Sequence, residues 1–355
     1  MSRAAAAAVF AAGLLLASVG GGLGVPYLQK VGWSAEAVLG LTAMVVGLGL
    51  AAFGTIVLVR SVRGVGRVGM VLLVALVAYA VVPSVAVAVA ATHVPRTTLA
   101  DVTPADLGLD YTDATFRTPD GVRLSGWYVP STNGDAVALL HGAGSTRTAV
   151  VEHARALAEL GYGVLLFDAR GHGRSGGRAM DLGWNGDADL AGAVRYLRAR
   201  PDVAGGRVLA VGLSMGGEEA IGALPAIPGL CGVVAEGATG RTASDQSWLS
   251  DAYGIRGLFQ EGMDRLKFGL TDLLTSASSP RSLRSAVAGA GTRHVLLIAA
   301  GREPDEEHAA RYIAGGAPGR VDVWVAPGAG HVGVFDARRA EWVQRVGDFL
   351  ASAPC

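Results

Sequence analysis

Two segments of the chain carry residue types that could together attack a carbonyl group. Ser214 lies in the pattern Gly212-Leu-Ser-Met-Gly216, between a stretch typical of a buried strand and one typical of a helix. Such a strand–turn–helix junction forces a strained turn that projects the serine hydroxyl. His331 follows the last apolar run and is the best-placed base. A serine hydroxyl is a weak nucleophile until a base removes its proton. The residues therefore predict acyl-transfer chemistry with Ser214 as nucleophile and His331 as general base.

The same pattern occurs a second time around Ser175, so the pattern alone does not identify the nucleophile. In a chain with 52 glycines, a match of this kind has little weight without its context. Ser175 follows the polar segment Arg170–Arg174 and leads into further glycine, outside any strand–turn–helix junction. We therefore expect Ser175 to be a loop residue and Ser214 to be the nucleophile.

A histidine base needs a carboxylate that fixes its tautomer and stabilises its charged form. The segment 301–307, which follows the apolar run 294–300, offers four acids. Pro304 stands three residues after the glycine, where the acid of such a loop usually lies. The candidates are its neighbours Asp305 and Glu303, and we favour Asp305. The alternative is structural, because a proline followed by acids is also typical of a helix start.

The oxyanion that forms during acyl transfer needs hydrogen-bond donors aimed at it in advance. The backbone N–H of Met215, at the start of the helix predicted after Ser214, is one candidate. The N–H of Ala143, in the glycine-rich loop 141–145, is the second. Such a loop could instead cradle a phosphate, but no Lys-Ser or Lys-Thr pair follows it and no G-x-G-x-x-G is complete. We expect an oxyanion hole formed by Met215 and Ala143.

These segments need a sheet to position them, and the chain alternates between strand-like and helix-like stretches. Residues 113–118 and 122–129 alternate in polarity and are separated by Pro-Asp-Gly, which is typical of a hairpin turn. Continuous apolar runs follow, with helix-like stretches between most of them; the runs are 136–140, 163–167, 207–211, 231–235, 294–300 and 321–325. Buried strands that alternate with helices predict a mainly parallel sheet covered on both faces.

One connection in this region is unusually long, with about 57 residues between the strand ending near 235 and the strand starting near 293. Apolar residues within it fall on one helical stripe that includes Phe259. The insertion, at about 237–290, is either an extra helix packed on the domain or a lid over the site. In the second case its apolar face would line the substrate pocket.

Four residues are predicted to contact the substrate. His141 and Gly142 belong to the predicted oxyanion loop, His172 lies in the loop that follows the strand 163–167, and Phe259 lies in the lid.

The N-terminal third predicts a membrane anchor of three helices. The mean hydropathy of the chain is +0.39, and most of the apolar excess lies before residue 92. Residues 4–28, 37–59 and 68–92 are each long enough to cross about 30 Å of hydrocarbon, and none of the three segments contains a charged side chain. A cleavable signal peptide is the alternative for the first segment.

The loops between these helices predict the orientation. The link 60–67 carries three arginines, whereas the link 29–36 carries one lysine balanced by one glutamate. The arginine-rich link should stay in the cytoplasm. A linker over 93–112 then leads to the domain 113–355 outside the cytoplasm, anchored in the cell membrane.

Charge and cysteine content exclude several classes of protein. Outside the first 91 residues, the chain carries 25 basic and 29 acidic side chains, without the basic stripe that a nucleic acid would need. Two cysteines are too few for a disulfide framework, and Cys231 opens an apolar run, so it is expected as a small core residue. No metal site is predicted.

Together these motifs resemble the α/β-hydrolase superfamily, over roughly residues 113–352. Asp168-Ala-Arg-Gly-His-Gly-Arg-Ser175 is similar to the loop after the fourth strand in its serine-aminopeptidase-like branch. The acid loop departs from the family pattern by one position. The resemblance implies an α/β-hydrolase fold and a Ser-His-acid acyl-enzyme mechanism without a metal or an organic cofactor.

The sequence therefore predicts a membrane-anchored serine hydrolase that cleaves carboxylic esters, with acyl or lipid-like esters suggested by the apolar lid. A peptidase or amidase would use the same three residues. A hydrolase fold used only for binding is the alternative from another class. Its sequence signature would be a missing nucleophile or base, and both are present.

Overall fold

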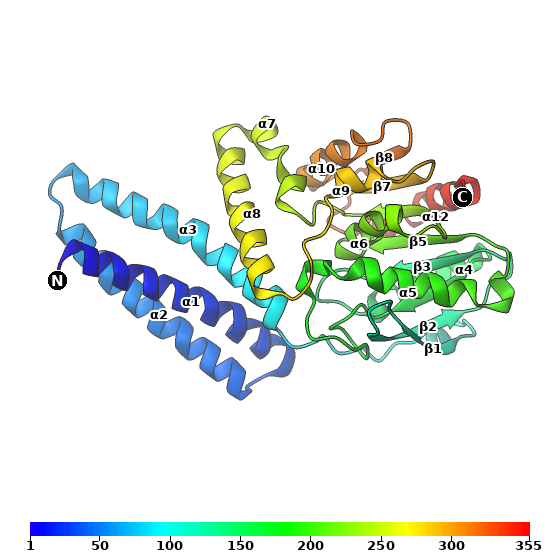
Figure 1. The fold of residues 1–355 in the computed structure, drawn as a ribbon, viewed down its shortest axis with the longest axis horizontal. Helices are drawn as coiled ribbons and strands as arrows, with labels where there is room; N and C mark the ends of the chain where they lie inside the picture. Colours follow the sequence, from blue (N-terminus) through cyan, green and yellow to red (C-terminus); the bar gives the residue numbers. More distant parts are fainter. The chain divides into compact units, whose positions relative to one another are not determined.

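The computed structural model describes residues 1–355, which divide into two compact units (Figure 1). The helical unit comprises residues 1–95 and 258–276, and the α/β unit comprises residues 96–257 and 277–355. The sequence predicts a membrane domain over 1–92 and a hydrolase domain over 113–355, and the compact units differ from this division in one respect. Part of the long insertion belongs to the helical unit.

The helical unit contains three helices that are long and apolar enough to cross a membrane. They are α1 (Arg3–Val31), α2 (Ala35–Arg60) and α3 (Val65–His93). At 1.5 Å per residue, even the 26 residues of α2 exceed the thickness of a hydrocarbon core of about 30 Å.

Small residues let α1 and α2 approach closely. A Cβ atom added to Gly47 would lie 2.3 Å from the backbone nitrogen of Ala17, and one added to Gly20 would lie 2.4 Å from that of Met44. Larger side chains at these positions would push the backbones apart. Close packing of small residues is a main source of stability between helices in lipid, where the hydrophobic effect is absent.

The long insertion contains helix α8 (Ile255–Leu274), which lies against α3. The ring of Phe259 stacks on Tyr79 of α3 with 6.0 Å between centroids, and the Ser84 hydroxyl donates a 3.3 Å hydrogen bond to the carbonyl of Met263. Neither of the two interpretations of the insertion included this contact with a membrane helix. The interpretation of α8 as a lid stays a prediction.

The α/β unit is built on one eight-stranded sheet with the order β1-β2-β4-β3-β5-β6-β7-β8. The strands are β1 (Thr112–Arg117), β2 (Arg123–Val129), β3 (Ala136–Leu140), β4 (Gly163–Phe167), β5 (Val208–Leu213), β6 (Leu230–Glu236), β7 (His294–Ala300) and β8 (Val321–Ala326). The β1–β2 hairpin is antiparallel and β2 pairs antiparallel with β4, whereas β3 to β8 are parallel. The mainly parallel sheet confirms the predicted fold class.

Helices cover both faces of this sheet (Figure 1). Four of them pack on one face: α5 (Gly186–Arg198), α6 (Met215–Ala223), α9 (Leu283–Ala288) and α10 (Pro304–Ala314). The other face is covered by α4 (Val151–Glu159) and α12 (Arg339–Ser352). Every residue of β3, β4, β5 and β6 is buried, as expected for strands covered on both sides. The short helices α7 (Leu249–Tyr253) and α11 (Val334–Ala337) lie in connections.

The two cysteines form a disulfide, which corrects the expectation that Cys231 is only a small core residue. Cys231 lies in β6 and Cys355 is the last residue of the chain, 124 positions later, with 4.4 Å between their Cα atoms. Spacing in the sequence gave no signal for this pair, because the approach of the C-terminal tail to a central strand depends on the packing of α12. The bond ties the tail to the core.

The disulfide should contribute to stability, because it restricts a long loop in the unfolded chain. For a loop of this length the chain-entropy model gives an upper bound of about 5 kcal/mol. We expect Cys355→Ser to lower the melting temperature of the purified protein in detergent and to make it insensitive to reductant, whereas reductant should lower that of the wild type. Equal melting temperatures for wild type and variant without reductant would contradict a formed bond.

Candidate functional site

The candidate site lies where four parallel strands end. Ser214 follows β5, Glu236 is the last residue of β6, Glu306 lies in α10 after β7, and His331 follows β8. The carboxyl ends of parallel strands meet at one edge of a sheet, and this edge is where open α/β sheets place their sites. The fold therefore brings together residues that are up to 117 positions apart in the sequence.

Ser214 occupies a strained turn between β5 and α6. Its φ of 51° and ψ of −121° are values that non-glycine residues rarely adopt. Its N–H donates a 2.7 Å hydrogen bond to the carbonyl of Glu236, which helps to hold the turn. Such strain costs of the order of 1–3 kcal/mol and is typical of functional sites.

The glycines that flank Ser214 are required by close packing. A Cβ atom added to Gly212 would lie 2.3 Å from the carbonyl oxygen of Gly216, and one added to Gly216 would lie 2.7 Å from the Cβ of Leu140. The helix therefore begins almost in contact with the strands before it. This explains the glycine pattern around Ser214 in physical terms.

A chain of two hydrogen bonds joins Ser214 to a carboxylate through His331. The Nε2 atom of His331 lies 3.0 Å from the Oγ of Ser214, and its Nδ1 atom lies 2.6 Å from the Oε1 of Glu306. The second carboxylate oxygen of Glu306 accepts a 2.8 Å hydrogen bond from the N–H of Ala300. With Nδ1–H donating to Glu306, Nε2 is free to accept the serine proton. The arrangement is competent for general-base activation of the hydroxyl.

Electrostatics support this protonation pattern. The hydrogen bond that Nδ1–H donates to Glu306 raises the pKa of His331 above its usual value of 6.5, against the opposing effect of partial burial. Glu306 is itself buried, so its carboxylate interacts with the imidazole through little intervening water.

The carboxylate that contacts His331 is Glu306, which corrects the choice of Asp305 or Glu303. Asp305 is exposed and accepts a 2.6 Å hydrogen bond from the Tyr253 hydroxyl, and Glu303 is the N-cap residue of α10. Helix α10 begins at Pro304, so the helical period decides which acid points inward. Glu306 shares the buried face with Ala309, Ala310 and Ile313, at spacings of three, four and seven. This spacing was visible in the sequence and could have identified Glu306.

The loop after β3 approaches the nucleophile. The N–H of Ser145 bonds to the carbonyl of Gly142 at 3.3 Å, and Gly144 has a φ of 66°, as a turn of this kind requires. A Cβ atom added to Gly142 would lie 3.4 Å from the Cβ of Ser214, which is ordinary van der Waals contact. Ala143 is exposed between these glycines. Met215 is the first residue of α6, where backbone N–H groups have no partner within the helix.

His141 bonds to the backbone on both sides of its ring, and its expected contact with the substrate stays a prediction. Its ring is buried, and its two nitrogens bond to the carbonyl of Gly142 at 2.8 Å and to the N–H of Ala169 at 3.1 Å. Burial lowers the pKa of His141 to about 4, so the ring is neutral. These bonds fix the proton on Nδ1 and hold the loop after β3 to the loop after β4.

The two other side chains predicted to contact the substrate also make contacts within the protein. His172 is buried, and its ring packs on that of His141 in a T-shaped arrangement with 4.9 Å between the ring centroids. Its Nδ1 bonds to the carbonyl of Arg170 at 3.0 Å. It therefore supports the loop, and its expected contact with a substrate stays a prediction. Phe259 stacks on Tyr79 within the helical unit, as described above.

Ser175 is a buried structural residue. Its hydroxyl donates to the carbonyl of Asp168 at 2.6 Å and accepts from the N–H of Ser125 at 2.9 Å. No part of it is accessible to solvent. The second serine match is therefore a loop residue, as expected from its context.

Glu236 is a second buried carboxylate that sequence reasoning missed. Its two oxygens accept hydrogen bonds from the N–H of Val334 at 2.9 Å and from the indole N–H of Trp342 at 3.0 Å. Burial raises its pKa to about 7. Because its own carbonyl holds Ser214, Glu236 joins the nucleophile turn to the segment that follows His331. An acid at the end of an otherwise apolar strand was the available signal.

The segment that follows α3 also holds the site loops. The hydroxyl of Thr97 donates a 2.8 Å hydrogen bond to the carbonyl of Gly144, and the carbonyl of Thr97 accepts one of 2.9 Å from the N–H of Gly173. Arg96 donates to the carbonyls of Ser175 and Gly177 at 2.6 and 3.1 Å. Two consecutive residues of the predicted linker thus connect the loop after β3 with the loop after β4.

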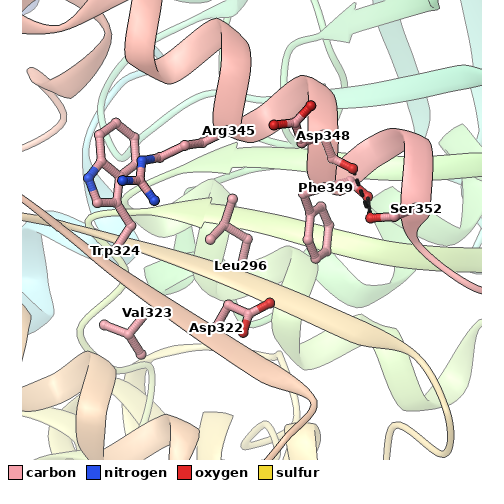
Figure 2. Close-up of a pocket in the computed structure, with 8 residues that line it drawn as sticks. All are labelled: Leu296, Asp322, Val323, Trp324, Arg345, Asp348, Phe349 and Ser352. Atoms are coloured by element: carbon pink, nitrogen blue, oxygen red, sulfur yellow. Dashed lines mark hydrogen bonds between the residues drawn. The ribbon is translucent and has the colours of Figure 1, made fainter.

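A separate cavity of about 450 Å³ lies between β7, β8 and α12 (Figure 2). Its walls include Leu296, Asp322 and Trp324, with the guanidinium of Arg345 5.0 Å from the ring of Trp324. None of the residues of the candidate site lines it. Asp322 is near the start of β8 and Ser352 ends α12, so this cavity faces away from the strand ends that carry Ser214 and His331. No cluster of three or more potential metal-ligating side chains is present in residues 1–355.

The strand order and the helices on both faces are those of the α/β-hydrolase fold, and comparison with known proteins agrees. Residues 132–287 match the profile of the family described as serine aminopeptidase S33. An esterase of Pyrococcus furiosus is 25% identical, with a TM-score of 0.57 over 74% of this chain and 99% of the esterase. A dienelactone hydrolase from Anabaena variabilis shares the fold at 17% identity, with a TM-score of 0.51 over 70% of this chain and 99% of that enzyme. The α/β unit therefore has the α/β-hydrolase fold.

Similarity to curated proteins is confined to part of the chain. An uncharacterized protein of Mycobacterium tuberculosis is 40% identical over 113 residues, which are 31% of this chain and 40% of the relative. The α/β-hydrolase domain-containing protein WAV2 of Arabidopsis thaliana is 31% identical over 127 residues, 35% of this chain and 40% of WAV2. The chain thus spans about 40% of the length of these relatives.

The position of Glu306 predicts the effect of two neighbouring substitutions. We expect Glu306→Gln to lower hydrolytic kcat/KM by about 10³- to 10⁴-fold, because the amide cannot stabilise the charged imidazole. Asp305→Asn should change it by less than about threefold, since Asp305 is exposed and its carboxylate bonds to the Tyr253 hydroxyl and not to His331. The reverse order would restore Asp305 as the partner of His331.

The same pair predicts a pH dependence. The neutral imidazole is the base, so activity should fall as pH drops through the pKa of His331, which Glu306 holds above 6.5. Glu306→Gln should move this acid limb to lower pH. The negative charges of Glu236, Glu218 and Glu303 also raise the pKa of His331. The acid limb of the pH–rate profile therefore reports the titration of His331 together with these acids. A pH–rate profile of wild type and variant measures the shift, and an unmoved limb would contradict it.

The hydrogen bond from Thr97 to Gly144 predicts a positioning role. Loss of one such bond, at about 1 kcal/mol, should lower kcat about fivefold in Thr97→Val with little change in KM. Thr97→Ser keeps the hydroxyl and should restore kcat. An equal loss in both variants would point to packing of the threonine methyl group instead.

Proposed function

We propose that the chain is a membrane-anchored serine hydrolase that cleaves carboxylic esters. The observation that carries the proposal is the hydrogen-bonded series Ser214–His331–Glu306 at a strained turn. Strain, a buried carboxylate and a correctly oriented imidazole each cost free energy. Their coincidence at one sheet edge is expected where an activated serine is required.

The residues perform the reaction in two halves. Ser214 Oγ attacks the ester carbonyl while His331 Nε2 accepts its proton, and the N–H groups of Met215 and Ala143 bond to the oxyanion. His331 then gives the proton to the leaving alkoxide, which leaves an acyl-serine. Water attacks this ester with His331 again as base, and collapse of the intermediate releases the acid and restores the serine hydroxyl. Glu306 stabilises the imidazolium in both halves.

Esters are favoured over amides by the comparison with solved structures. The Pyrococcus furiosus protein that is similar over nearly its whole length is described as an esterase. A peptidase or amidase is the second candidate, because the matching family profile is described as that of a serine aminopeptidase. Both reactions use the same three side chains, so the substrate panel decides between them.

The anchor is proposed to place the α/β unit outside the cytoplasm. Three helices have the length and composition of membrane spans, and the arginine-rich link lies between the second and third. The disulfide between Cys231 and Cys355 supports this orientation, because disulfides persist in oxidising compartments.

Covalent labelling by a fluorophosphonate probe tests the proposed activity. We expect the probe to label the wild type both with the Cys231–Cys355 disulfide formed and after its reduction. Ser214→Ala should not be labelled, because only an activated serine reacts. Ser175→Ala is the matched control among the two serine matches and should keep its label if it folds, as judged by its melting temperature. Hydrolysis of paired ester and amide substrates then measures the preference.

Two outcomes would contradict the proposal. Absence of label on a folded wild type would favour a binding function of the fold. Label that persists in Ser214→Ala would show that another residue is the nucleophile.

A further inference from the structure

The helical unit contains an apolar cavity of about 350 Å³ between α1, α3 and α8. Nine of its ten lining residues are aliphatic, and the exception is His93 at the end of α3; the aliphatic ones are Leu15, Val19, Leu23, Val85, Ala88, Val89, Leu270, Leu273 and Leu274. The volume falls within the range of small-molecule sites, which are typically about 300–1,000 Å³. A site with such walls selects a hydrocarbon chain.

The cavity reaches inward from one end of α3. Val85 and His93 are eight residues apart, so they span about 12 Å of helix axis at 1.5 Å per residue. His93 lies at the exposed end, with its Nδ1 2.7 Å from the hydroxyl of Thr92. A polar group at the mouth and aliphatic walls below it match an amphiphile with a headgroup and one chain.

Helix α8 supplies one wall and is itself amphipathic. Ion pairs Glu261–Arg265 and Asp264–Lys267 lie along it, and it is not among the helices with the composition of membrane spans. Yet Ile255 is 88% exposed, Leu258 56% and Leu273 81%. Exposed apolar residues in this number mark an interaction surface, and this combination with charge is typical of helices that lie in the membrane interface.

Helix α8 touches α3 at a few side chains. Phe259 stacks on Tyr79, the carbonyl of Met263 accepts a hydrogen bond from Ser84, and Leu270 shares the cavity with Val89. The walls that α1 and α3 supply belong to helices with the length and composition of membrane spans. In a bilayer such helices face lipid chains, so a lipid is the occupant that the chemistry of the walls favours.

We propose that this cavity binds one acyl chain of an amphiphilic membrane lipid, with the headgroup near His93. The inference rests on the membrane insertion that forms part of the proposed function, and is independent of catalysis by Ser214. Helix α8 lies in the connection between β6, which ends at Glu236, and β7, which leads to Glu306. A bound acyl chain would therefore stabilise a segment that is covalently continuous with both sides of the site.

Photolabelling of the full chain in lipid nanodiscs tests the proposal. The probe is palmitic acid with a diazirine on its chain, applied to Ser214→Ala protein so that no reaction with the serine contributes. We expect label on peptides of α1, α3 and α8 that excess unlabelled palmitate displaces. Val19→Trp and Leu273→Trp, which fill the cavity from two different walls, should each lower the displaceable label at least fivefold.

The control is Leu39→Trp, at a 70% exposed position of α2 that does not line the cavity, and it should leave the displaceable label unchanged. Neither Val19 nor Leu273 is fully buried, so these variants should fold, which their melting temperatures check. Label spread over α2, or label that excess palmitate does not displace, would reduce the binding to ordinary contact with the bilayer and overturn the proposal. If the wild type takes no fluorophosphonate label while Ser214→Ala keeps the displaceable palmitate label, the proposed catalysis is rejected and the lipid site is not.

Discussion

The site depends on the close approach of backbone around Ser214. The residue holds a conformation that costs free energy, and it can do so because the glycines on either side allow helix α6 to begin against the ends of β5 and β3. From this turn the rest follows. The helix start presents its first N–H groups beside the hydroxyl, and the neighbouring strand ends supply the histidine and the acid. A larger residue at Gly212 or Gly216 would displace all of them together.

Two buried carboxylates have different roles at this sheet edge. Glu306 contacts the imidazole and raises its pKa, whereas Glu236 holds the backbone around it through Val334 and Trp342. Burial is the largest of the effects that raise the pKa of Glu236 to about 7, in a position that joins the nucleophile turn to the histidine loop. Electrostatics and loop geometry are thus coupled at the site.

The fold was predictable because its signals are local, whereas parts of the site depend on distant packing. Apolar runs and a Pro-Asp-Gly turn identified the strands, and the strand–turn–helix context separated Ser214 from Ser175. The acid was misassigned to Asp305 because loop position was used where the period of helix α10 decides. The roles of His141 and His172 could not be read from the sequence, since a histidine in a glycine-rich loop can equally face a substrate or brace the backbone. The disulfide partner of Cys231 and the packing of α8 depend on contacts across more than a hundred residues.

The placement of α8 changes how the two units can be separated. The chain passes between them three times, near residues 95, 257 and 276, so the anchor is not a simple N-terminal extension. During synthesis the helices α1 to α3 emerge long before α8, so the helical unit is complete only after β6 has been made. Removal of the first 95 residues would leave the apolar face of α8 in water and produce a protein prone to association.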